Sequence, residues 1–74
     1  MRYRTQYTLR TWRAVRGLTL NEASKRIGVS VPTLIAWEKD KTIPMADKIP
    51  KIEQAYNIKW SDDVIFPANN AKSN

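Results

Sequence analysis

The sequence predicts an all-α domain with a helix-turn-helix unit near its centre. Between Asn21 and Glu38, apolar residues recur at helical spacing on both sides of one glycine, Gly28. These apolar positions are Ala23, Ile27, Val29, Leu34 and Trp37. No segment alternates apolar and polar residues as a half-buried strand does, and the sequence has no internal repeat. The pattern is typical of two short helices that bury one face each against the other across a tight turn.

The first helix is expected to begin after Thr8 and to run to about Arg16. A threonine in this place accepts a hydrogen bond from an amide of the first turn. Gly17 follows, and glycine easily adopts the left-handed conformation that ends many helices. The residues expected on the buried face are Leu9, Trp12 and Val15.

The second helix has a two-sided capping signal. Thr19 and Glu22 fit the capping box, in which each side chain accepts a hydrogen bond from the backbone amide of the other residue. A helix is therefore expected over residues 20–27. Gly28 should end it, and Val29 should pack between the two helices of the unit.

The third helix is expected to run to residue 38 or 39. Ser30 is the natural cap, and Pro32 then falls in the first turn, where its missing N–H costs nothing. Because proline disfavours helical dihedrals in the preceding residue, the cap at Val31 is the alternative.

Two further helices are expected after a loop over residues 40–44. Asp47 should cap the fourth, with Pro50 in the first turn and Asn57 at the end. The apolar stripe of this helix comprises Ile49, Ile52 and Tyr56. Ser61 should cap a short fifth helix that reaches Phe66. We expect a flexible basic arm over residues 1–6, one domain over residues 7–66 and a disordered tail over residues 67–74.

Composition excludes several classes of function. The chain has 74 residues, a formal net charge of +6 and neither His nor Cys. Disulfides, thiolate zinc sites and most nucleophile and general-base arrangements are therefore excluded. Of the seven acidic residues, only Asp62 and Asp63 are adjacent, where a helix start favours negative charge. We expect no enzyme, no metal site and no cofactor.

The same composition bears on compartment and partners. No segment approaches the roughly 20 apolar residues that span a bilayer, and the first ten residues lack the apolar run of a secretory signal. We expect a cytoplasmic protein of a bacterial cell, nucleoid-associated when bound, with no membrane or small-molecule partner. The positive charge is typical of a nucleic-acid binder, although a solvated surface produces the same excess.

Residues distributed from about Leu9 to Phe66 resemble the Cro/cI-type, or XRE-like, helix-turn-helix family. The residues that carry the resemblance are Leu9, Trp12, Arg13, Arg16-Gly17-Leu18-Thr19, Glu22, Ile27-Gly28-Val29-Ser30, Thr33-Leu34, Trp37-Glu38 and Pro44. The match covers most of the chain without a large gap. It implies a compact five-helix bundle of the lambda-repressor-like type, which binds a palindromic double-stranded DNA operator as a homodimer.

The resemblance also implies a role for each matching position. The exposed face and N-terminus of the third, recognition helix would read bases, and they comprise Ser30, Val31, Pro32, Thr33, Ile35 and Ala36. The residues that would approach DNA phosphates are Thr19, Lys39, Lys41 and Thr42. Arg13 and Glu38 match a partly buried ion pair between the first and third helices; solvated surface charges are the alternative.

Four positions depart from the family pattern. Leu20 stands where the family often has a phosphate-contacting Gln, and Ser24 replaces the small Ala of the helix crossing. Asp40 replaces the usual Gly after the third helix, and Pro50 is unusual within the fourth. These departures affect the expected phosphate contacts more than the fold.

The recognition helix is poor in hydrogen-bonding side chains. Sequence reading commonly uses Arg on guanine, or Asn and Gln on adenine, whereas Val31, Pro32, Ile35 and Ala36 offer apolar contact only. We expect packing against thymine methyl groups, supplemented by DNA shape. The alternative is that the apolar side chains of this helix belong to a protein interface.

Both ends of the domain carry candidate contacts. Arg2 and Arg4 are candidates for following the DNA backbone or entering a minor groove, against the alternative of a frayed terminus. The C-terminal apolar residues are candidates for a self-complementary dimer interface, against the alternative of simple closure over the core. These residues are Trp60, Val64, Ile65 and Phe66. Trp12 and Trp37 are expected in the core.

Two functional hypotheses follow. The first is a sequence-specific DNA-binding repressor that occupies an operator as a dimer. The chain ends soon after the fifth expected helix, so a Cro-like phage or mobile-element regulator fits its length better than a long phage repressor. The second is a protein-interaction module of the antitoxin or anti-repressor type, which the apolar recognition helix favours and the net charge opposes.

Overall fold

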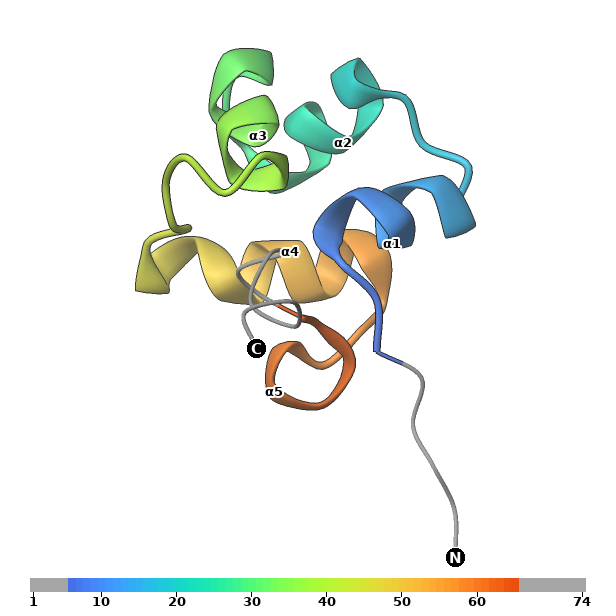
Figure 1. Cartoon of the computed structure of the whole chain (residues 1–74). Helices are drawn as coiled ribbons and strands as arrows, with labels where there is room; N and C mark the ends of the chain where they lie inside the picture. The colour runs from blue at the N-terminus through green and yellow to red at the C-terminus, as the bar shows by residue number, and fades with distance from the viewer. Residues whose placement is uncertain (1–5, 66–74) are drawn as a thin grey trace, which may run out of the picture.

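The computed structural model describes residues 6–65. Its helices are α1 (Leu9–Val15), α2 (Leu20–Ile27), α3 (Val31–Glu38), a 3-10 turn (Ala46–Lys48), α4 (Ile49–Tyr56) and α5 (Trp60–Asp63). Figure 1 shows α2 and α3 together above α4, with α1 on the right between α2 and α4, and α5 below α4. The all-α fold with five α-helices, expected from the sequence, is confirmed.

The caps expected for the first three helices are all formed. The Thr8 hydroxyl accepts from the Thr11 amide at 3.3 Å, and Thr19 and Glu22 form both halves of the capping box. Ser30 caps α3, so the alternative cap at Val31 is wrong. These predictions depended on local sequence alone, because a cap joins residues three positions apart.

The caps expected for α4 and α5 are wrong. Asp47 lies inside the 3-10 turn that leads into α4, and the N-cap Lys48 makes no side-chain capping bond. Ser61 lies inside α5, which begins one residue earlier. Two acids hold the start of α5 instead, Asp63 from the end of α5 itself and Glu53 from α4. The Asp63 carboxylate accepts from the Lys59 amide at 2.8 Å, and that of Glu53 accepts from the Trp60 amide at 2.9 Å.

The buried core is formed by one face of each of the helices α1 to α4, together with Val64 from the segment after α5. Its buried members are Leu9, Trp12, Ala23, Ile27, Leu34, Trp37, Ile52, Tyr56 and Val64. Val15 was expected on this face and is 51% exposed. At about 100° per residue, Val15 is turned about 120° away from Leu9, which explains its exposure. Val29 packs against the core from the turn, as expected.

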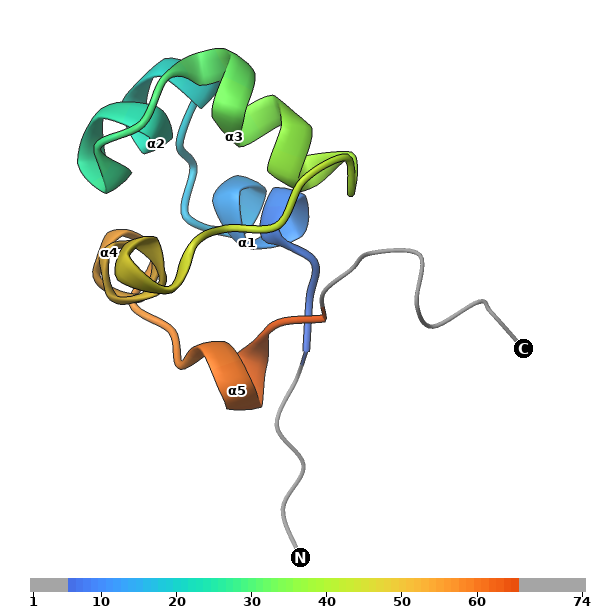
Figure 2. The ribbon, with the colours of Figure 1, turned by 90° about the vertical axis from the view of Figure 1, so that its left-hand side faces the viewer.

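A parallel bridge between Tyr7 and Val64 joins the two ends of the described chain. The Tyr7 amide donates to the Asp63 carbonyl, and the Ile65 amide donates to the Tyr7 carbonyl, each at 3.0 Å. The indole of Trp12 donates to the same Asp63 carbonyl at 2.7 Å. Figure 2 shows the segment entering α1 beside the segment leaving α5. The bridge ends α5 at Asp63, so the helix expected to reach Phe66 is shorter.

Arg16 joins α1 to the C-terminal end of α4. Its guanidinium donates to the carbonyls of Tyr56 and Asn57 at 2.5 and 3.2 Å and lies 5.1 Å from the ring centroid of Trp12. Asn57 ends α4 in the left-handed conformation, as expected, with φ of 56°. The cation therefore sits where the carbonyls at a helix C-terminus favour positive charge.

Candidate nucleic-acid interface

The turn between α2 and α3 sets the geometry of the helix-turn-helix unit. Gly28 ends α2 with φ of 90°, a conformation that costs a residue with a side chain about 1–2 kcal/mol. The amides of Gly28 and Val29 both donate to the Ser24 carbonyl, at 2.8 and 3.0 Å. Ser24 itself is buried, and its hydroxyl donates to the Asn21 carbonyl at 3.0 Å. The serine that departs from the family pattern therefore has its hydrogen bond satisfied within α2.

The N-terminus of α3 is closed by two hydroxyl groups. The Ser30 hydroxyl accepts from the Thr33 amide at 3.3 Å and lies 2.9 Å from the Thr33 hydroxyl. Pro32 occupies the first turn, as the sequence predicted. Because Ser30 and Thr33 already bond each other, a base contact by either one competes with this cap.

The outward face of α3 is almost entirely apolar. Leu34 and Trp37 turn inward and are buried, so the tryptophan is core, as expected. The residues left on or near the surface, each exposed or half-buried, are Val31, Pro32, Thr33, Ile35 and Ala36. The structure therefore brings together the residues that the sequence proposed for base reading, with Thr33 and Ser30 as their only side-chain hydrogen-bonding groups.

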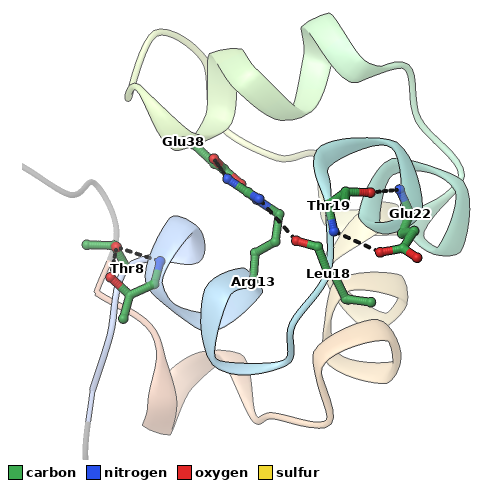
Figure 3. A network of polar contacts seen from close by, with 7 residues as sticks. Thr8, Arg13, Leu18, Thr19, Glu22 and Glu38 are labelled. Carbon is green, nitrogen blue, oxygen red and sulfur yellow. Dashed lines mark hydrogen bonds and ion pairs between the residues drawn. The ribbon is translucent and has the colours of Figure 1, made fainter.

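The start of α2 lies beside α1 and α3 (Figure 3). The Thr19 hydroxyl accepts from the Glu22 amide at 3.0 Å, and the Glu22 carboxylate accepts from the Thr19 amide at 2.9 Å. The hydrogen bond donated by the Thr19 amide is the largest cause that lowers the pKa of the exposed Glu22 carboxylate below its ordinary value. The capping box places a negative charge at the positive end of α2, close to where the sequence proposed a phosphate contact.

The segment after α3 carries the other proposed phosphate contacts. Lys39 is the C-cap of α3, and Lys39, Lys41 and Thr42 are all exposed. Asp40 lies between the lysines with φ of 61°. A left-handed residue is needed here for the chain to leave α3, which accounts for the glycine of the family pattern.

Arg13 and Glu38 form a two-pronged ion pair between α1 and α3. Arg13 Nε lies 2.7 Å from Glu38 Oε2, and Arg13 Nη2 lies 3.1 Å from Glu38 Oε1. Arg13 Nη1 also donates to the Leu18 carbonyl at 3.1 Å, and Figure 3 shows the side chain spanning the gap between the helices. The side chains of Arg13 and Glu38 are 16% and 7% exposed. The hydrogen bond to Glu38 raises the pKa of Arg13 above its ordinary value.

The C-terminal apolar residues divide between core and surface. Val64 is buried and belongs to the core, so its side chain is not available for the dimer contact proposed from the sequence. Trp60 and Ile65 are half-buried. Arg2, Arg4 and Phe66, for which contacts were also proposed, lie outside the described residues, as does the tail over residues 67–74.

Several surface features of the domain were not predicted from the sequence. Ile43 and Met45 are each 71% exposed in the loop after α3. Arg10 lies one turn before Arg13 on α1 and lines a hollow that also includes Leu20 from α2, and Ile35 and Lys39 from α3. The spacing of Arg10 and Arg13 was a usable signal, because residues three apart share a helix face.

Comparison with known proteins identifies the family. A helix-turn-helix profile matches residues 9–62 of the chain. The chain belongs to this helix-turn-helix family. It is also similar to an uncharacterized HTH-type transcriptional regulator of Methanocaldococcus jannaschii, with 36% identity over 58 residues that cover 78% of this chain and 88% of the relative. No solved structure gives a significant match.

Family membership confirms the Cro/cI-type resemblance drawn from the sequence. The matched residues run from α1 into α5 and contain the whole helix-turn-helix unit. Within residues 6–65, no helix is long and apolar enough to cross a bilayer. In the same residues, no group of three acidic side chains is placed to hold a metal ion.

Proposed function

We propose that this chain is a sequence-specific, double-stranded DNA-binding regulator that inserts α3 into the major groove. The observation that supports it most is the row of apolar side chains on the outward face of α3, of which Pro32 is exposed and the others are half-buried, flanked by a capped helix start and followed by exposed lysines. An α-helix fits the major groove of B-DNA, and lysines beyond it neutralise phosphates. Membership of the helix-turn-helix family supports the same assignment.

Base reading on this proposal is largely apolar. The apolar side chains that would pack against thymine methyl groups are those of Val31, Pro32, Ile35 and Ala36, with Ser30 or Thr33 adding a hydroxyl contact. The residues that would touch phosphates on either side of the recognition helix are Thr19, Lys39, Lys41 and Thr42. The role is one of binding rather than catalysis, and the mode of regulation is steric repression by a Cro-like protein of a phage or mobile element.

We further propose that the chain acts as a homodimer on a palindromic operator in the cytoplasm. Half-sites about 34–36 Å apart place two recognition helices on one face of the duplex. With Val64 buried, the described C-terminal residues that would contribute to the contact are Ile65 and Trp60, both half-buried, and Trp60 also packs against the core. Sedimentation of the chain with and without its selected site, at equal protein concentration, measures this assembly.

Selection from a random duplex pool tests the base-reading role of α3. The wild-type chain and Ala36→Gln are each used to select sites, with Gln54→Ala on the exposed face of α4 as the control. A glutamine at position 36 should add a preference for adenine, because its amide bonds the N6 and N7 edge. The control should keep the wild-type preference. If Ala36→Gln also keeps it, this face of α3 does not read bases.

The second candidate function is a protein-interaction module on the same fold. The apolar surface of α3 and the two exposed apolar side chains of the following loop, Ile43 and Met45, favour it. A gel shift at low salt separates the two functions. Binding that survives excess nonspecific duplex supports the regulator, and no shift with any duplex supports the interaction module.

A further inference from the structure

One side of α3 offers a duplex apolar surface without hydrogen-bonding side-chain atoms. We call this surface the outward apolar face, and its members are Val31, Pro32, Ile35 and Ala36. At about 100° per residue, they fall within an arc of about 140° around the helix. The buried Leu34 and Trp37 lie on the opposite side. The helix is therefore held by one side, and the other side meets a base edge through carbon-bound hydrogens alone.

The polar side chains that border the outward apolar face do not distinguish the two pyrimidines. Ser30 Oγ lies 2.9 Å from Thr33 Oγ1 and accepts from the Thr33 amide at 3.3 Å, so both hydroxyls are engaged in the cap. A hydroxyl both donates and accepts, and it therefore bonds thymine O4 or cytosine N4. Lys39 lies on the same side of α3, but it is the C-cap, about 12 Å along the axis from Val31. Its proposed contact is a phosphate.

Thymine and cytosine differ in two ways in the major groove. Thymine presents the O4 acceptor and a methyl group on C5, whereas cytosine presents the N4 donor and no methyl group. A surface that forms no hydrogen bond to O4 or N4 detects only the second difference. In 5-methylcytosine the C5 position carries the same methyl group as in thymine. The outward apolar face would therefore gain the same contact from either base.

We propose that α3 recognises the C5-methyl group of pyrimidines as such, so that 5-methylcytosine replaces thymine in the operator. This inference rests on the proposed DNA-binding function and names the class of duplex that the site accepts. It also gives the regulator an input that needs no small-molecule pocket in the protein. Methylation of a cytosine at C5 turns a weak site into a strong one, and the DNA itself carries the signal.

Four versions of the selected duplex test this inference. At each T:A pair in turn, and at the same pair of both half-sites, the duplex carries T:A, U:A, 5-methyl-C:G or C:G. Uracil is thymine without its methyl group, so two comparisons remove the methyl group alone: T:A with U:A, and 5-methyl-C:G with C:G. The dissociation constant of the full chain is measured for each duplex at one fixed salt concentration, because phosphate contacts depend on salt.

Loss of one buried methyl contact weakens binding about fourfold, so loss of one in each half-site should weaken it about 16-fold. The 5-methyl-C:G duplex should bind within about twofold of T:A, and C:G should bind as weakly as U:A.

Val31→Thr and Ile35→Thr each put a hydroxyl in place of apolar surface on α3. Each should reduce the methyl effect at the pair it contacts to below about fourfold. Gln54→Ala, on the exposed face of α4, is the control and should keep the full methyl effect. Thermal melts establish that all three variants stay folded.

The outcomes separate the inference from the proposed function. If 5-methyl-C:G binds as weakly as C:G while T:A binds strongly, α3 reads more than the methyl group; the inference is overturned and the regulator stands. If both threonine variants keep the full methyl effect, the methyl group acts through the shape of the duplex, and again only the inference is overturned. If the wild type binds no duplex, both are overturned.

Discussion

Removal of the Glu38 carboxylate tests whether the contact between α1 and α3 stabilises the domain. In the folded protein, Glu38 accepts two hydrogen bonds from Arg13, at 2.7 and 3.1 Å. Glu38→Ala leaves the guanidinium without its counter-charge, in a place where only 16% of the Arg13 side chain is exposed. Arg13 keeps one partner, the Leu18 carbonyl.

The magnitude follows from the burial of the two side chains. Removing one member of a fully buried pair costs about 3–5 kcal/mol, whereas an exposed pair contributes about 0–1 kcal/mol. Glu38 is nearly buried and Arg13 is partly exposed, so we expect Glu38→Ala to lower the free energy of unfolding by about 2–3 kcal/mol. A 74-residue domain has about 4–11 kcal/mol in total. The melting temperature should therefore fall by about 10–20 °C.

Urea and thermal unfolding, followed by far-UV circular dichroism, measure this loss. Asp47→Ala is the matched control, because it also removes one carboxylate, from an exposed residue that caps no helix. It should change the stability by less than about 0.5 kcal/mol. A cycle with Arg13→Met, Glu38→Leu and the double variant gives the coupling energy. The double variant should be more stable than the sum of the single losses predicts, since no charge is left without a partner.

Two results would refute this reasoning. A loss below about 0.5 kcal/mol for Glu38→Ala, equal to that of Asp47→Ala, means that the pair behaves as an exposed one. Strict additivity in the cycle means that the two side chains do not interact, whatever their distance in the structure.

Three further predictions concern a turn, a buried hydroxyl and a cap. Gly28→Ala should lower the free energy of unfolding in urea by about 1–2 kcal/mol, and backbone strain is the cause because an added Cβ meets open space. A synthetic chain with D-alanine at this position should lose no stability. If the D-alanine chain loses as much as Gly28→Ala, the loss comes from side-chain packing instead. Burial raises the pKa of Tyr56 to about 12, and its hydroxyl has no hydrogen-bond partner among the described residues. Tyr56→Phe should therefore keep or raise the free energy of unfolding. A loss above about 1 kcal/mol would show that the hydroxyl is hydrogen-bonded. The pKa of Glu22 is lowered in the folded protein, so its negative charge stabilises the fold above pH 4.5, and this stabilisation is lost as the pH falls through the folded-state pKa. Glu22→Gln should therefore be less stable than the wild type at pH 7 and equally stable at pH 2. A difference in stability that does not change with pH would exclude the charge as the cause.

The helix caps and helix ends that were predicted correctly depend on local sequence. Thr8, Thr19 and Ser30 each cap a helix by bonding an amide three residues ahead, and such a bond needs no information from elsewhere in the chain. Gly28 and Asn57 ended their helices as expected for the same reason. Helical spacing identified most of the core, because the buried face of a short helix recurs every three or four residues.

Some features were predicted wrongly because they depend on contacts between different elements. Ser61 was expected to cap α5, but the start of this helix is held by the Asp63 carboxylate within α5 and by the Glu53 carboxylate from α4. Val64 looked available for a dimer contact, but its pairing with Tyr7 buries it. The hollow between α1, α2 and α3 likewise has walls from three helices, and no local pattern in the sequence joins Arg10 to Lys39.

The buried and outward faces of α3 have different roles. Leu34, Trp37 and Glu38 fix the helix against the core and α1, while its outward face offers few polar groups. A buried methyl contact contributes about 0.8 kcal/mol, against about 1–3 kcal/mol of discrimination for a bidentate hydrogen-bonded pair. A regulator that reads bases mainly through apolar contacts gains little sequence discrimination from each base pair, and it gains most of its affinity from phosphate contacts. We therefore expect steep salt dependence and a shallow sequence preference from one protomer, with two recognition helices on one operator supplying the specificity that a single helix lacks.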